Sequence, residues 1–143
     1  MWIHALAGGL WVAAGGCFVI AGMAITAGSA EQQNLVMKAA PKINGLCLAA
    51  AIGVVVTGGI NLALAGVMRN FQFSTQFGWI LGAKVLLFAG MFLMLRRGFR
   101  VVVEARLRPE SVADATPMMV RVYGASAAMG GVALLLGLWL MGS

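Results

Sequence analysis

The sequence predicts an all-α fold, an integral membrane four-helix bundle that forms a single transmembrane domain over residues 1–143. Hydrophobic residues make up 62 % of the chain, charged residues only 10 %, and the mean hydropathy is +0.96. A soluble domain carries about 25 % charged residues, so a chain this poor in charge is expected to lie in a membrane. A helix needs roughly 20 apolar residues to cross a hydrocarbon core of about 30 Å, and four stretches of the sequence are long enough.

The predicted spans cover about 2–27, 44–68, 78–95 and 122–141. Before the second span, the pattern Ser29-x-x-Gln32 is typical of a capping box and predicts a surface helix over about 29–40, which Pro41 ends. Before the fourth span lies the only long polar stretch, a basic connector over about 96–121. We expect this connector to extend the third helix, to break near Pro109 and to continue as a short amphipathic piece.

Basic residues are distributed unevenly over the connectors. The first and third connectors hold eight of the ten, namely Lys38, Lys42, Arg96, Arg97, Arg100, Arg106, Arg108 and Arg121. The positive-inside rule therefore predicts that both connectors are cytoplasmic and that both termini lie on the outer, periplasmic side. Trp2, Trp79 and Trp139 fall at the outer ends of their spans, as an aromatic belt requires.

The basic connector is expected to contact anionic lipid. A nucleic-acid partner is not expected, because no aromatic residues interleave with a basic face.

The strongest polar side chains of three spans are predicted at a similar depth. With a rise of 1.5 Å per residue, His4 lies within about 5 Å of the outer boundary, Lys84 about 9 Å and Asn61 about 10 Å from it. Ionisable residues inside a membrane indicate a functional site, so we predict an outer-leaflet site formed by these three residues. The alternative is that His4 bonds to headgroups or water near the interface, or that the three groups satisfy one another.

A stripe along the first helix supports the same grouping. Gly8, Trp11 and Gly15 follow His4 at spacings of four, three and four residues, which places them on one helix face. Glycine there permits the close approach of either another helix or a flat ligand, and helix packing is the commoner reason for it in membranes. Gly8, Trp11 and Gly15 are therefore candidate cofactor-binding residues, together with His4, Asn61 and Lys84. Cys17 and Cys47 stand alone in apolar runs and are interpreted as small buried hydrophobes.

Three segments resemble two related families of small bacterial membrane proteins. The segments are His4-(six residues)-Trp11 followed by Val-Ala-Ala-Gly, TGGINLALAG in the second span, and GWILGAKVLLFAGM in the third. The families are the copper-resistance protein D-like family and the four-helix protoporphyrinogen IX oxidase family, and the resemblance implies a multi-pass protein of the bacterial inner membrane. In the oxidase family a histidine of the first helix and a lysine of the third are functionally important, and the proteins are associated with haem b. By position, the resemblance implies His4 as the metal ligand and Lys84 as a catalytic residue.

The sequence leaves three functions open. The first is a haem-associated redox protein in electron transport, with His4 as ligand or propionate contact and Lys84 as propionate or substrate partner. Because the chain has one histidine, a second haem ligand would be a methionine, Lys84, a residue of another chain or none. The second is a non-catalytic accessory or scaffold subunit of a respiratory or photosynthetic membrane complex, which packs against other membrane subunits or a second copy. The third is a copper transport element, in which Met68 and Met141 would join His4. A quinone or a carotenoid at the site is also open.

Overall fold

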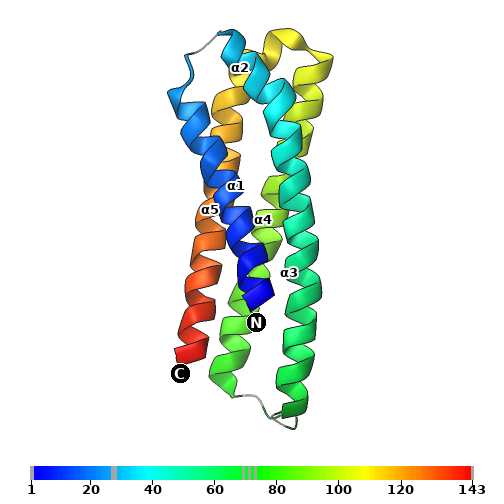
Figure 1. Ribbon diagram of the computed structural model, residues 1–143, viewed down its shortest axis with the longest axis vertical. Coiled ribbons are helices and arrows are strands. Elements are labelled where there is room, and N and C mark those ends of the chain that lie inside the picture. The colour runs from blue at the N-terminus through cyan, green and yellow to red at the C-terminus, as the bar shows by residue number, and fades with distance from the viewer. Residues whose placement is uncertain (1, 27–28, 69, 71, 73, 143) are drawn as a thin grey trace.

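The computed structural model describes residues 2–26, 29–68, 70, 72 and 74–142, with the side chains of residues 109 and 140–142 left aside. Four helices are long and apolar enough to cross a membrane: Trp2–Ala24, Ala30–Met68, Thr75–Leu107 and Val112–Trp139. They pack lengthwise into one bundle (Figure 1). The prediction of an all-helical chain with four helices of spanning length is confirmed, and this composition supports a multi-pass membrane protein.

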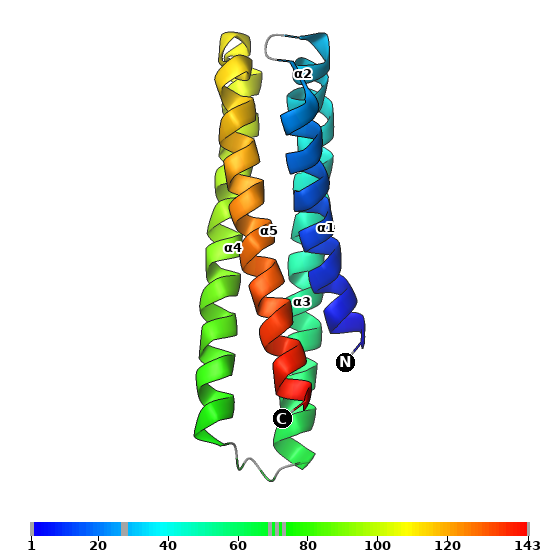
Figure 2. The same ribbon diagram turned by 90° about the vertical axis from the view of Figure 1, so that its left-hand side faces the viewer.

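The elements follow in the order α1 (Trp2–Ala24), α2 (Ala30–Asn34), the π-helix η1 (Leu35–Ala39), α3 (Ala40–Met68), α4 (Thr75–Leu107), the 3-10 turn η2 (Pro109–Ser111) and α5 (Val112–Gly142). The α3–α4 connection and the chain ends lie toward one end of the bundle, here called the loop end (Figure 1). The α1–α2 and α4–α5 connections lie at the other, here called the connector end. α5 packs against both α1 and α4, and α1 packs against α3 (Figure 2), whereas the contact between α3 and α4 is much smaller than these three. In Figure 1 the ribbons of α3 and α4 part from the middle of the bundle toward the loop end.

The predicted surface helix is continuous with the second span, and Pro41 does not end it. The Ser29 hydroxyl accepts a hydrogen bond from the Gln32 backbone N–H at 3.2 Å, which confirms the predicted N-cap. The helix then passes through the π-turn of η1 into α3 without a break. In η1 the Ala40 N–H reaches the Leu35 carbonyl, one residue farther back than in an α-helix. Pro41 has no backbone N–H and cannot donate a helical hydrogen bond. Because it follows directly after this widened turn, the chain remains helical at this position.

The basic connector is helical over most of its length. α4 continues to Leu107, and the break falls at Arg108 and the turn Pro109–Ser111, as the sequence predicts. The amphipathic piece after the break is not separate, because it forms the first turns of α5 and contains Pro117 within the helix. Pro117 cannot donate to the Ala113 carbonyl, and the Gln32 side chain donates to that carbonyl instead, at 3.3 Å.

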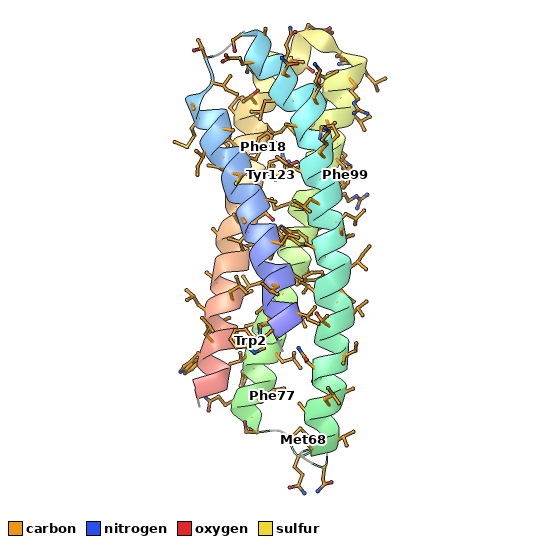
Figure 3. The ribbon with its side chains drawn as sticks, viewed as in Figure 1. Trp2, Phe18, Met68, Phe77, Phe99 and Tyr123 are labelled. Carbon is orange, nitrogen blue, oxygen red and sulfur yellow. The ribbon has the colours of Figure 1, made fainter. Side chains whose placement is uncertain are left out.

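Two apolar clusters form the core of the bundle, and both contain hydrogen bonds between helices. The cluster at the connector end includes Phe18 and Tyr123, whose rings pack with centroids 4.5 Å apart (Figure 3). The Tyr123 hydroxyl donates to the Asn44 side-chain oxygen of α3. The middle cluster surrounds Trp11, whose indole N–H donates to the Ser126 hydroxyl at 2.8 Å. Toward the loop end, fully buried side chains become rare, and the candidate site lies there.

The two cysteines differ in environment, and both are free. Cys47 is buried in the middle cluster, as predicted from its apolar surroundings. The prediction for Cys17 is wrong, because its side chain is exposed on the outer face of α1. An apolar neighbourhood in the sequence cannot separate the two environments, since a membrane-spanning helix is apolar on its lipid-facing side as well.

Candidate functional site

The site begins with a hydrogen bond between the first and second membrane-spanning helices. The His4 ring of α1 places Nδ1 at 3.0 Å from the Thr57 hydroxyl oxygen of α3. That hydroxyl in turn donates to the Gly53 carbonyl one turn back on α3, at 2.5 Å. A hydroxyl has only one proton to give. Since Thr57 gives its proton to Gly53, its oxygen can accept a hydrogen bond from His4 Nδ1–H.

This arrangement favours the tautomer of the neutral ring that is protonated on Nδ1. With the proton on Nδ1, the Nε2 atom of His4 carries the free lone pair. Histidines that bind metals commonly donate their other ring N–H to an oxygen acceptor, which orients the ring and sets its tautomer. Thr57 occupies that position relative to His4. Nε2 is therefore the atom of this site that can bind a metal ion or accept a proton.

Glycines of α3 allow the histidine to lie against the helix backbone. A Cβ atom added at Gly58 would lie 3.2 Å from His4 Cε1, which is tighter than an ordinary contact. One turn deeper, a Cβ at Gly53 would lie 3.3 Å from the Ala7 side chain of α1. Small residues are the usual means by which membrane helices approach closely. The sequence around Gly53 and Gly58 thus sets the distance at which the His4 ring meets Thr57.

Lys84 brings α4 to the same site. Its side chain is half-buried, and its charge acts electrostatically on the His4 ring. The Lys84 Nζ atom lies 3.0 Å from the position that a Cβ of Gly137 would take, so a larger residue there would displace it. No acidic side chain pairs with Lys84 within the described parts of the chain. The four acidic residues of the sequence, Glu31, Glu104, Glu110 and Asp114, all belong to the connector end.

Asn61 lies one turn away from Thr57 and forms no hydrogen bond with this group among the described residues. It is half-buried and stands four residues after Thr57, on the same face of α3 and one turn closer to the loop end. The structure therefore brings together His4, Lys84 and Thr57, and it leaves Asn61 at the margin.

The glycine stripe of α1 faces α5. A Cβ at Gly8 would lie 3.1 Å from Leu134, and one at Gly15 would lie 3.2 Å from the Tyr123 carbonyl oxygen. Trp11 is fully buried, bonds Ser126 of α5 and meets Phe88 of α4 edge-on, with ring centroids 6.1 Å apart. These contacts match the helix-packing interpretation of the stripe. A cofactor-binding role for Gly8, Trp11 and Gly15 stays a prediction.

The possible sulfur ligands lie elsewhere. Met68 is 85 % exposed at the very end of α3 (Figure 3). It stands eleven residues, or about 16 Å of helix, beyond Thr57. The Met141 side chain falls outside the described residues. Within the described part of the chain, no three His, Cys, Asp or Glu side chains gather closely enough to hold a metal ion.

Thr57 is the residue of the site that the sequence reasoning missed. A threonine in an apolar helix attracts little attention, because its hydroxyl can bond the carbonyl one turn back, as it does here. A signal was present in the sequence. Thr57 precedes Asn61 by four residues, so the helix face that carries Asn61 also carries Thr57.

Comparisons with known proteins do not extend this description. No protein-family model, no curated protein and no solved structure matches the chain.

Replacing Thr57 by valine, which keeps the side chain's shape, should leave the His4 Nδ1–H without its acceptor. We expect the free energy of unfolding to fall by about 1–2 kcal/mol, because a half-buried donor is left unpaired. Thr57→Ser, which keeps the hydroxyl, is the matched control and should lie close to the wild type. The measurement is denaturant unfolding in mixed micelles followed by circular dichroism. In a His4→Ala background the same Thr57→Val change should cost little; an equal cost in both backgrounds would show that the two side chains are not coupled.

Proposed function

We propose that this chain is a haem-associated redox protein in which His4 Nε2 would bind the haem iron. The observation that carries the proposal is the hydrogen bond from His4 Nδ1–H to Thr57, which leaves Nε2 as the lone-pair atom. A single imidazole is a sufficient protein ligand for haem iron in several classes of haem protein. When bound, the haem would supply one-electron chemistry, and the protein would supply binding, orientation and electrostatics.

The donor set fits haem b better than a bare metal ion. A haem needs one or two strong protein ligands, whereas a closed copper or zinc site needs more side chains than the His4 neighbourhood offers. Haem also carries two acidic propionates, and Lys84 is a cation without an acidic partner among the described residues. Lys84 would thus balance the charge of one propionate or hold an acidic substrate beside the ring. The resemblance of this chain to the four-helix protoporphyrinogen IX oxidase family points to the same two residues.

We further propose that the connector end faces the cytoplasm and the loop end faces the periplasm of a bacterial inner membrane. The eight basic residues of the first and third connectors belong to the connector end. Trp2, Trp79 and Trp139 are exposed at or near the loop end, where an outer aromatic belt would lie. This orientation agrees with the positive-inside rule and places His4 and Lys84 in the outer half of the membrane. It also places the basic connector against the anionic lipid of the inner leaflet.

A second candidate is an accessory subunit of a larger membrane complex. Gly78 and Gly82 of α4 are both exposed, and a Cβ at either glycine would meet no described atom within 4 Å. A Gly-x-x-x-Gly pair that is open on a spanning helix favours contact with a helix of another chain, whether a partner subunit or a second copy. A copper transport element is the third candidate. Because Met68 lies far along α3 from His4, it would need ligands from a second protomer.

The test of the haem proposal is the absorption spectrum of the protein purified in mild detergent after expression with supplied haem. We expect a Soret band that sharpens on reduction with dithionite. His4→Ala should abolish this band because it removes the proposed ligand. Leu6→Ala, which changes an exposed residue of the same helix, is the control and should keep it. A colourless wild-type protein would overturn the proposal and favour the accessory subunit, whose partners would then be sought by co-purification.

The orientation is tested with single cysteines in a background that lacks Cys17 and Cys47. A membrane-impermeant maleimide should label Ser74→Cys in intact spheroplasts, because Ser74 lies at the loop end. Ser111→Cys, in the turn at the connector end, should react only after permeabilisation. This difference follows from the excess of basic residues at the connector end. Labelling of Ser111→Cys alone in intact spheroplasts would reverse the proposed orientation.

A further inference from the structure

The cytoplasmic part of α4 carries two parallel rows of exposed side chains. One row is basic and follows the four-residue spacing of Arg96, Arg100 and Arg108, with Glu104 between the last two. The other row is apolar and consists of Phe99, Val103 and Leu107, which are 37 %, 53 % and 77 % exposed. Because residues four apart stack on one helix face, the rows run side by side along the helix. They line a shallow, open hollow of about 550 Å³ on the surface of this one helix, here called the α4 groove.

The depth of the α4 groove places it at the membrane surface. α4 has 33 residues and is about 50 Å long, whereas the hydrocarbon core is about 30 Å thick. Measured from Gly78 at the predicted outer boundary, Arg96 lies about 27 Å and Arg100 about 33 Å along the helix. These two arginines therefore fall where the hydrocarbon ends and the lipid phosphates begin. The apolar row continues from there through the headgroup layer.

The charges of the groove have no partner within the described chain. None of the described residues forms an ion pair, and Glu104 is the only acid in the groove beside its three arginines. Arginine presents a planar fork of donors that matches a phosphate group. An apolar row beside it suits the glycerol and acyl carbons of the same molecule. A soluble acidic peptide would match the arginines but would leave Val103 and Leu107 facing water.

We propose that the α4 groove binds one anionic phospholipid, whose phosphate is held by Arg96 and Arg100 and whose apolar part lies along Phe99 and Val103. This goes beyond a diffuse attraction between basic residues and the membrane, because it names a defined strip on one face of one helix. It rests on the proposed membrane insertion of α4 and is independent of the proposed haem. The absorption spectrum of His4→Ala and the lipid measurement below can therefore fail separately.

The test is a titration of the purified full chain in neutral detergent, with bound lipid counted by native mass spectrometry. Phosphatidylglycerol should bind with a defined first dissociation constant, and phosphatidylcholine should bind much more weakly. Arg96→Gln with Arg100→Gln should weaken phosphatidylglycerol binding by about 30-fold, since each basic residue near an anionic surface contributes about fivefold. Val103→Ser, which leaves every charge in place, should weaken it by roughly threefold.

Arg106→Gln with Arg121→Gln is the matched control, because it removes the same charge from the connector end without changing the groove. Its affinity for phosphatidylglycerol should stay within about threefold of the wild type, since distant charges are screened. Equal losses in the two double variants would overturn the groove in favour of diffuse attraction. Two results would overturn an anionic phospholipid as the ligand of the groove. One is that phosphatidylcholine binds as tightly as phosphatidylglycerol. The other is that inorganic phosphate, at the same concentration as the lipid, displaces the lipid completely. As a folding control, each variant should unfold at the same temperature as the wild type in detergent without lipid. A weaker affinity for phosphatidylglycerol is then not caused by unfolding.

Discussion

One face of α5 supplies the polar contacts on which the bundle depends. Apolar side chains give no driving force for association inside a hydrocarbon core, and each unsatisfied polar group there is costly. α5 meets most of this constraint with residues that repeat on one helix face and that reach every other segment of the bundle. Its Thr116 accepts from Gln32 of α2, Tyr123 donates to Asn44 of α3, Ser126 accepts from Trp11 of α1, and Gly137 accommodates Lys84 of α4. The Asn44 Nδ2 atom is an exception, because it is buried without a hydrogen-bond partner among the described residues.

The candidate site follows from this arrangement. The Trp11–Ser126 bond and the glycine stripe hold α1 against α5, and the same buried side of α1 also meets α3. Because Gly53 and Gly58 leave room on α3, the first turn of α1 comes close enough for His4 to donate to Thr57. Lys84 arrives from α4 on the other side of α5. Three helices thus supply one side chain each, toward the end of the bundle where the ribbons of α3 and α4 part (Figure 1) and fully buried side chains are rare.

The sequence predicts the four spanning helices well because their signal, length and hydropathy, is local. It also predicts the Ser29 cap and the break near Pro109, which are fixed by a few neighbouring residues. It does not predict that the helix continues through Pro41 or that Pro117 lies within α5, since both depend on how neighbouring backbone groups are satisfied. The pairing of His4 with Thr57 is equally hidden, because a spanning helix is apolar on all sides and its sequence does not reveal which face meets a neighbour. Depth brought His4 and Lys84 together in the prediction. Thr57 and Asn61 share one face of α3, and the position of α1 along the axis of α3 decides that His4 meets Thr57, one turn deeper than Asn61.

The state of the His4 ring is the most direct test of the proposed site. The chain has one histidine, so labelling with ¹⁵N-histidine gives the signals of this ring alone. A long-range ¹H–¹⁵N spectrum of the haem-free protein in micelles, recorded at mildly alkaline pH, distinguishes the two neutral tautomers. The structure predicts a proton on Nδ1 and a free lone pair on Nε2. A ring protonated on Nε2 would contradict it, because Nε2 could then bind no metal and Thr57 would not be the acceptor that orients the ring.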